Sequence, residues 1–335
     1  MNKHHTSVAV YGANGHTGKF VLAELHRRSI PAIAVVRDPS RRVAGVTGRI
    51  ATIDDPAALD RALAGCSVVI NCAGPFLDTA PPLVEAALRT GCSYLDVTAE
   101  QTSAQATFSS FDQPARDAGV TVIPAAGFYG GLADLLATAL VHDEAADAIT
   151  IAVALDHWWP TEGTRLTGER NQAPRMIIED GKLSPMPLPA QTADWAFGTP
   201  HGAQSVVEMS FSEIITISRH LSMRSLRSYL GANALEDVRD ASTPPPTATD
   251  AQGRSAQRFA MDVVVADAGG TRRITASGQD IYAVSAPIVV EAAERLLTGR
   301  VRSRGALALG QAFDNRDFLD ALAPTHLDLA FHGAS

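Results

Sequence analysis

Short apolar runs and amphipathic segments alternate along residues 1–130 of the chain. Nearly uniform apolar runs lie at 7–12, 32–38, 49–53, 67–74, 93–98 and 120–127, and helical spacing of apolar residues is found at 17–28, 56–64, 82–90 and 104–118. Uniformly apolar runs are typical of strands that are buried on both faces of a sheet. Strands that alternate with helices predict a doubly wound parallel sheet, the Rossmann type of α/β fold.

The pattern changes after Gly131, where apolar and polar residues tend to alternate. Strand candidates lie at 148–159, 205–218, 258–270 and 271–284, and helical patterns lie at 161–179 and 286–297. Alternation of this kind indicates an antiparallel sheet with one face toward water. We therefore expect a Rossmann domain at 1–130 and a second, α+β domain with a mostly antiparallel sheet at 131–284.

Composition and charge narrow the classes of function. The chain has 335 residues, is 46% hydrophobic and carries a formal net charge of −8. An acidic balance without a basic block speaks against nucleic acid as a partner, and no apolar run is long enough to span a membrane. The three cysteines form no C-x-x-C pair, and no group of residues has metal-ligand spacing. With no secretion signal, a cytoplasmic location is expected.

Three glycines at a spacing of three follow the first predicted strand and open the first predicted helix. In this context Gly12 permits a tight turn, Gly15 lets backbone N–H groups approach a pyrophosphate, and Gly18 lets helix and strand pack closely. The hydroxyl of Thr17 can donate to a phosphate. The cofactor residues predicted in this loop are Gly12, Ala13, Asn14, Gly15, Thr17 and Gly18.

The end of the second strand predicts which dinucleotide binds. Arg37 stands where an NAD-binding site carries an acidic residue, and Arg41 follows closely. A guanidinium suits a 2′-phosphate, so NADP(H) is expected and NAD(H) is the weaker alternative. If Asp38 faces the ribose instead, NAD would be preferred. After the third strand, Asp54 is a candidate for the adenine amino group, with a helix cap as the alternative role.

Three segments beyond the glycine loop carry a resemblance to a known family. Asn-Cys-x-Gly-Pro-Phe at 71–76, Tyr-x-Asp-Val-Thr-x-Glu at 94–100 and the segment 125–137 resemble those of the saccharopine dehydrogenase-like oxidoreductases. The resemblance covers 1–141 and returns near the C-terminus. It implies that the first domain binds NAD(P), that helices within 285–335 complete this domain, and that the second domain carries substrate contacts and a homodimer interface.

One segment departs from the pattern of the resembled family. Relatives carry an acidic residue where this chain has Tyr129, whereas Asp134 matches their second acidic position. An anchoring carboxylate for a substrate amine is thus missing. The departure favours a less charged acceptor over an amino acid.

Candidate active-site residues follow the carboxyl ends of the predicted strands, where ligands bind in open α/β sheets. A loop along the nicotinamide ribose is expected from Ala73, Gly74, Pro75 and Phe76. The catalytic candidates are Tyr129 as a general acid, Glu100 near the reacting centre and His157 as a proton donor. For Glu100 the alternative is a cap on the following helix, and for Tyr129 it is a buried aromatic residue. Candidates for substrate contact are Arg165, Trp158 and Trp195, with core packing as the alternative for the tryptophans.

These features predict an NADP-dependent oxidoreductase that transfers hydride to a C=C, C=N or C=O bond of a small or carrier-borne substrate. The Tyr-x-x-x-Lys pair of short-chain dehydrogenases is absent from the sequence, which speaks against a carbonyl reductase of that class. Two alternatives stay open. One is an imine reductase that forms C–N bonds as saccharopine dehydrogenases do, and the other is a non-catalytic protein that senses NADP.

Overall fold

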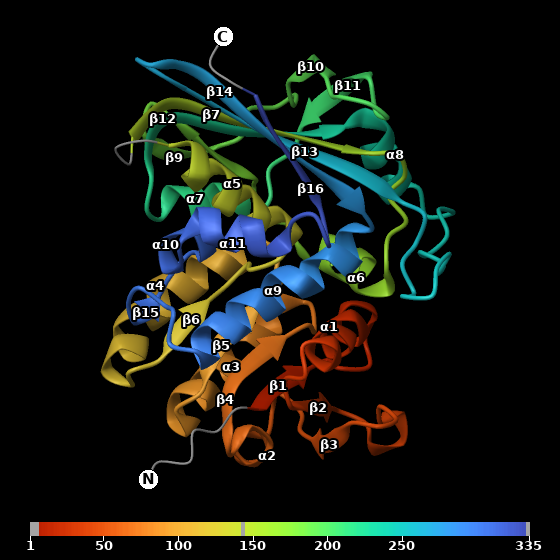
Figure 1. Ribbon diagram of the computed structural model, residues 1–335, viewed down its shortest axis with the longest axis vertical. Helices are drawn as coiled ribbons and strands as arrows, with labels where there is room; N and C mark the ends of the chain where they lie inside the picture. Colours follow the sequence, from red (N-terminus) through yellow and green to blue (C-terminus); the bar gives the residue numbers. More distant parts are fainter. Residues whose placement is uncertain (1–6, 142–144, 333–335) are drawn as a thin grey trace.

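The computed structural model describes residues 7–141 and 145–332, whose strands form two separate sheets (Figure 1). The first sheet has seven strands, all parallel, in the order β15-β6-β5-β4-β1-β2-β3. Its strands are β1 (Ser7–Tyr11), β2 (Ala32–Val36), β3 (Thr47–Ile50), β4 (Cys66–Asn71), β5 (Ser93–Asp96), β6 (Thr121–Ile123) and β15 (Gly305–Ala306). The predicted doubly wound parallel sheet is confirmed.

The helices of this half lie close to the predicted segments. They are α1 (His16–Arg27), α2 (Pro56–Leu63), α3 (Phe76–Thr90), α4 (Gln101–Asp117) and α5 (Ala133–Leu140), with the short helical turns η1 (Pro39–Arg41) and η2 (Phe128–Leu132). Asp55 caps α2 by accepting a 2.9 Å hydrogen bond from the Ala58 N–H. Gly91 ends α3 with a φ of 72°. The predicted start of α3 was Pro82, but the helix begins at Phe76 and contains Pro81 and Pro82.

The second sheet has nine strands, in the order β10-β11-β12-β7-β13-β14-β16, with β8 paired to β12 and β9 paired to β8. All its pairs are antiparallel except the parallel pair of β7 and β12, so the expected mostly antiparallel sheet is confirmed. The strands are β7 (Ala145–Leu155), β8 (Met176–Glu179), β9 (Lys182–Pro185), β10 (Thr192–Ala196), β11 (Ala203–Glu208), β12 (Ser222–Gly231), β13 (Arg258–Asp267), β14 (Gly270–Gln279) and β16 (Asp328–His332). The helices are α6 (Glu162–Arg170), α7 (Glu213–Ser218), α8 (Ala232–Arg239), α9 (Ile281–Leu297), α10 (Leu309–Ala312) and α11 (Asn315–Leu322).

Two predicted elements of this half are wrong. The helix expected at 161–179 ends at Arg170, and a hairpin of β8 and β9 follows. Its turn has positive φ at Asp180 (47°) and Gly181 (74°), a backbone that Asp-Gly adopts readily. The strand expected at 205–218 divides into β11 and the helix α7, because the chain leaves the sheet after Glu208.

Helices between the two sheets join them through a shared core. In Figure 1, α5, α7, α9 and α11 lie between the sheets. One hydrophobic cluster includes Val10 of β1, Val289 of α9 and Val263 of β13, all fully buried. Arg28, next to α1, pairs with Glu291 and, at 2.8 Å, with Glu294 of α9. The two sheets are therefore packed through common elements.

The C-terminal segment contributes one strand to each sheet. β15 pairs with β6 of the first sheet, but β16 pairs with β14 of the second. The pairing satisfies the outer N–H and C=O groups of β14, which would otherwise be an open edge. Among the helices of the described residues, none is long and apolar enough to cross a bilayer.

Candidate active site

The loop from β1 to α1 has glycines where a side chain has no room. A Cβ at Gly12, which has a φ of 75°, would lie 2.9 Å from the Cβ of Ala73. A Cβ at Gly18 would lie 2.3 Å from the carbonyl oxygen of Gly12. Gly15 begins α1 without a side-chain cap, which leaves the N–H groups of the first turn for an anion. This cradle fits the pyrophosphate of a dinucleotide.

The loop after β2 holds Asp38 in a local hydrogen-bond network. Its carboxylate accepts bonds from the Ser40 hydroxyl (2.7 Å) and the Ser40 N–H (2.8 Å), and these bonds keep the pKa of Asp38 below its ordinary value. The Asn14 amide donates to the carbonyl of Arg41 at 3.3 Å and brings this loop beside the glycine loop. Arg37 is exposed directly after β2. The arrangement supports Arg37, rather than Asp38, as the group that faces the ribose.

Tyr11, at the end of β1, has a buried hydroxyl without a hydrogen-bond partner among the described residues. Burial raises its pKa to about 12, and the charges of Arg37 and Asp54 act on it. A hydrogen bond from Thr52 lowers the pKa of Asp54, whereas the helix cap is made by its neighbour Asp55. An orphaned hydroxyl beside Arg37 and Asp54 fits the adenosine end of a dinucleotide.

The loop after β4 is held by side chains of its own half and covered by the second. Asn71 accepts from the Ala73 N–H at 3.0 Å, and the Thr79 hydroxyl donates to the Ala73 carbonyl at 2.7 Å. A Cβ at Gly74 would lie 3.0 Å from the Thr167 hydroxyl oxygen of α6. The loop expected along the nicotinamide ribose therefore lies between the two halves.

Glu100 caps a helix, but not the helix that was considered for it. It precedes α4 and makes no side-chain cap there. Its carboxylate instead accepts a 2.8 Å bond from the N–H of Phe76, which is the first residue of α3. Burial raises the pKa of Glu100. The side chain thus lies at the loop predicted to contact the nicotinamide.

Asp96 ties together the loops that follow β5 and β6. Its carboxylate accepts bonds from the Ala125 N–H (2.8 Å), the Thr98 N–H (3.0 Å) and the Tyr94 hydroxyl (2.9 Å). Complete burial raises its pKa to about 6. The carboxylate is fully used by these bonds, so we assign it a positioning role for the segment that leads to Tyr129.

Tyr129 lies after β6 within an aromatic cluster. Its ring stacks on Phe211 with centroids 4.1 Å apart, and Trp158 lies 6.0 Å away. The ring is 9% exposed, and its hydroxyl has no hydrogen-bond partner within the described part of the chain. Burial raises the pKa of Tyr129 well above 10. Tyr129 is therefore a buried aromatic residue, as the alternative interpretation has it, but its hydroxyl is bonded by no described residue.

Two charged residues beside Phe211 were missed by the sequence analysis. The guanidinium of Arg175 lies 4.8 Å from the Phe211 ring centroid, and Glu213 accepts a 2.8 Å bond from the Phe211 N–H. Burial raises the pKa of Glu213 to about 7 and lowers that of Arg175. The signal for Glu213 was an acidic residue within an apolar run. Arg175, in a segment predicted to be a polar helix, gave no such signal.

Tyr282, at the start of α9, links this cluster to the glycine loop. Its hydroxyl bonds with the Trp158 indole N–H and the Thr164 hydroxyl, each at 2.9 Å. Its ring lies edge-on to His16, with centroids 5.4 Å apart. His16 is the first residue of α1, and its buried Nε2 lacks a partner among the described residues. Ring contacts and the hydrogen bond between Tyr282 and Trp158 therefore connect the glycine loop to Tyr129.

The structure does not bring the other three candidates into this cluster. The ring of His157 is 59% exposed and lies against Asp237, with 3.6 Å between Nδ1 and Oδ2. Arg165 donates to the carbonyls of Asp240 (3.3 Å) and Thr243 (2.7 Å). Trp195 donates to Asp262 at 2.8 Å on the opposite face of the second sheet. The shared pocket expected for Trp158 and Trp195 is therefore not formed.

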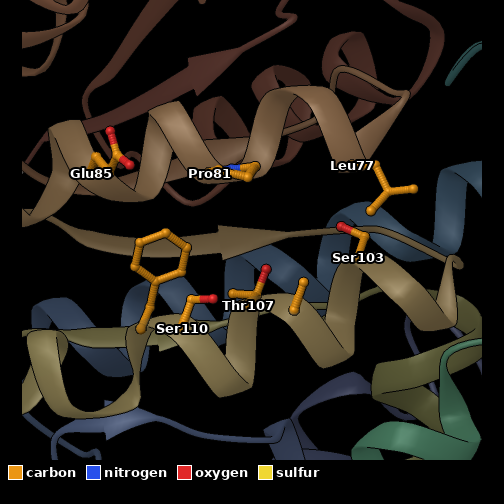
Figure 2. A pocket seen from close by; sticks show the side chains of 8 residues that line it. Leu77, Pro81, Glu85, Ser103, Thr107 and Ser110 are labelled. Atoms are coloured by element: carbon orange, nitrogen blue, oxygen red, sulfur yellow. The ribbon is translucent and has the colours of Figure 1, made fainter.

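Two surface clefts lie apart from the aromatic cluster. A cleft of about 340 Å³ runs between α3 and α4, and Figure 2 shows Leu77, Pro81 and Glu85 on one side and Ser103, Thr107 and Ser110 on the other. No predicted site residue lines it. A second cleft, of about 490 Å³, includes Trp195, Arg273 and His332 on the outer face of the second sheet.

Sequence comparison assigns the first half of the chain. Residues 8–123 match the family model of the saccharopine dehydrogenase NADP binding domain, which confirms the resemblance and the predicted cofactor, NADP(H). The human saccharopine dehydrogenase-like oxidoreductase is 30% identical over 152 residues, which are 38% of this chain and 35% of the relative. A trans-acting enoyl reductase of Mycobacterium bovis is 29% identical over 133 residues, 36% of this chain and 32% of the relative. The chain thus matches about a third of the length of these relatives.

The whole fold has a counterpart among solved structures. The apo saccharopine dehydrogenase (L-Glu forming) of Saccharomyces cerevisiae superposes with a TM-score of 0.68. The superposition covers 98% of this chain and 100% of that chain at 15% sequence identity. At this identity the similarity establishes the fold, including the second sheet, which the family model does not cover.

Proposed function

We propose that this chain, with an NADP binding domain at 8–123, is an oxidoreductase that reduces a C=C, C=N or C=O bond in a small or carrier-borne substrate. The observation that carries the proposal is the position of the Tyr129 cluster. It lies after the carboxyl end of β6, where open α/β sheets bind ligands, and ring contacts together with the hydrogen bond between Trp158 and Tyr282 connect it to the glycine loop. The division into a cofactor domain (1–130 with 285–335) and a substrate and dimerisation domain (131–284) belongs to the same proposal.

Residues of the first half are proposed to hold the cofactor. NADPH, when bound, supplies the reducing hydride. The glycine cradle would hold the pyrophosphate, and Arg37 with Arg41 would bind the 2′-phosphate, which gives a preference for NADP(H) over NAD(H). Asp38 supports this preference, because its Oδ1 atom already accepts two bonds from Ser40 and ties the side chain to its own loop.

Tyr129 is the proposed proton donor. Burial raises the pKa of Tyr129, so the hydroxyl would give its proton only to a strongly basic atom, such as that of a developing enolate or alkoxide. Its oxygen has no partner among the described residues, so it is available to a substrate atom. Phe211 and Trp158 would exclude water around that atom. For Glu100, the bond to Phe76 supports a role in holding the cofactor loop.

The test is a paired measurement of NADPH and NADH binding by calorimetry, followed by NADPH oxidation with enoyl thioesters, cyclic imines and keto acids. We expect tighter binding of NADPH and turnover with one of these classes. Failure to bind either dinucleotide would refute the proposal. Tight NADPH binding without turnover in any class would favour the NADP-sensing alternative. Turnover that requires an amine together with a keto acid would favour the C–N forming alternative.

The homodimer and the cytoplasmic location stay predictions. Light scattering during size-exclusion chromatography tests the first, and fractionation of the source cells tests the second. A monomer at micromolar concentration would contradict the expected dimer.

A further inference from the structure

We infer that Arg175 is the anchor of a subsite for a substrate carboxylate, between the two halves of the molecule. The inference rests on the proposed function, because it assigns the substrate class to the same cluster. It goes further by naming a small carboxylic acid, with its reducible bond near Tyr129, as the ligand.

The guanidinium of Arg175 is partly buried and makes no direct ion pair with a described residue, although the charge of Glu213 acts on it from a greater distance. Its Nη1 donates to the carbonyl of Ser210, and its flat face lies over Phe211. No carboxylate oxygen of the described residues lies within 4.0 Å of it. A charge removed from water is costly unless it is paired, and burial accordingly lowers the pKa of Arg175. The remaining N–H groups can therefore bind an anion that the chain itself does not provide.

Other polar groups around Phe211 are also unsatisfied. The Tyr129 hydroxyl and the second carboxyl oxygen of Glu213 are buried, and neither has a partner among residues 7–141 and 145–332. Buried polar groups are almost always hydrogen-bonded in proteins. Two such groups without a partner, close to a guanidinium that makes no ion pair, therefore indicate a place where a ligand would form the missing hydrogen bonds.

The second half is fastened to the cofactor half at this point. The Gln101 side chain exchanges two 2.8 Å bonds with the backbone of Met176, the residue after Arg175. The Ser212 hydroxyl donates to the Thr98 carbonyl at 3.0 Å. Thr98 follows β5, so these bonds hold Arg175 at the carboxyl edge of the parallel sheet, where the proposed chemistry takes place.

The charges favour a carboxylate over a phosphate. Arg175 carries one positive charge; Glu213 and Tyr129 of the cluster act on it, and so does the exposed Arg239 of α8 from outside. With a pKa of about 7, Glu213 is only about half ionised near neutral pH and offsets the charge of Arg175 in part. A planar monoanion matches a single guanidinium in bidentate geometry, whereas a phosphate dianion would leave excess charge near Glu213.

Matched acid and amide probes test the subsite directly. Binding of cinnamate and cinnamamide, and of crotonate and crotonamide, is measured by calorimetry with the full-length protein loaded with NADP⁺. We expect each acid to bind the wild type at least about tenfold more tightly than its amide, and Arg175→Met to abolish this preference. Arg175→Lys keeps the positive charge but not the two-pronged guanidinium, so this variant should keep part of the preference for the acid. Arg224→Met, at an exposed arginine of β12, should leave it unchanged.

The outcomes separate this inference from the proposed function. NADPH binding by each variant is measured first and reports that the variant is folded. If the wild type binds NADPH but prefers no acid over its amide, the subsite is refuted while the reductase proposal stands. Retention of the preference by Arg175→Met would also refute it. If the wild-type protein does not bind NADPH, the proposed function is refuted instead.

Discussion

Glu100 accepts a 2.8 Å hydrogen bond from the backbone N–H of Phe76, so an acidic residue that precedes α4 caps the start of α3. The bond joins the loop after β5 to the loop after β4, both of which lie at the carboxyl edge of the parallel sheet. One buried carboxylate thereby fixes the loop that is proposed to contact the nicotinamide.

Substitution of Glu100 should separate its capping role from acid catalysis. Glu100→Ala removes the acceptor for the Phe76 N–H, and we expect a loss of about 1–2 kcal/mol in the free energy of unfolding. Glu100→Gln keeps an acceptor oxygen and should retain both stability and turnover. Urea denaturation and NADPH oxidation are the measurements. A large loss of kcat in a stable Glu100→Gln variant would show that the carboxyl group takes part in the chemistry.

Arg37→Ala should weaken NADPH binding and leave NADH binding unchanged, because only NADPH has the 2′-phosphate that the guanidinium would bind. We expect a loss of about 10- to 100-fold in NADPH affinity, as for one charge-assisted bidentate interaction. Fluorescence titration with both dinucleotides measures it, and Arg61→Ala on the exposed surface of α2 is the matched control. An equal effect on both dinucleotides would contradict the assignment of Arg37.

Tyr129→Phe should lower kcat without a loss of stability. The hydroxyl has no partner among the described residues, so its removal costs no hydrogen bond and relieves an unsatisfied buried group. If it donates the proton, kcat should fall by about 10²-fold or more. Stopped-flow measurement of NADPH oxidation and thermal unfolding test this pair of effects, with Tyr229→Phe on β12 as the control. Unchanged kcat would exclude Tyr129 as the donor.

The contribution of Glu213 to the free energy of unfolding should fall as the pH rises. Burial raises its pKa from 4.5 to about 7, with Phe211, Ser228 and Arg175 as the facing groups that oppose the shift. At this group the folded state therefore binds more protons than the unfolded state between these values, so the contribution of Glu213 to stability is greatest below pH 4.5 and decreases until about pH 7.

The matching variant is Glu213→Gln, which removes this titration. Its free energy of unfolding relative to the wild type should rise by on the order of 3 kcal/mol between acid and slightly alkaline pH. Asp96 titrates with the same sign in both proteins and cancels in the difference. Glu236→Gln, at an exposed position of α8, should give a flat difference. If the difference in free energy of unfolding between Glu213→Gln and the wild type also stays constant with pH, the pKa of Glu213 is not raised in the folded protein.

Local sequence signals were enough for the parallel sheet and its cofactor. A Cβ at Gly12 or Gly18 would lie less than 3.0 Å from Ala73 or from the backbone of the same loop, so these two positions leave no room for a side chain. Uniform apolar runs and an Asp-Pro helix start depend on neighbours that are near in the sequence. The hairpin at Asp180 and Gly181 also had a local signal, the Asp-Gly pair, but the hairpin was not predicted because the preceding residues have a polar helical pattern.

The proposed active site, by contrast, was decided by the tertiary structure. Tyr129, Arg175 and Glu213 come from segments that are far apart in the sequence and meet around Phe211 only when the second sheet packs onto the first. The same packing turned Trp195 to the opposite face and left His157 at the surface. The residues alone indicated a dinucleotide site, because the geometry of the glycine loop depends on residues that are near one another in the sequence, and Arg37 after β2 favoured NADP(H). Which charged side chains become buried, and which of these make no ion pair, depends on contacts between residues that are far apart in the sequence.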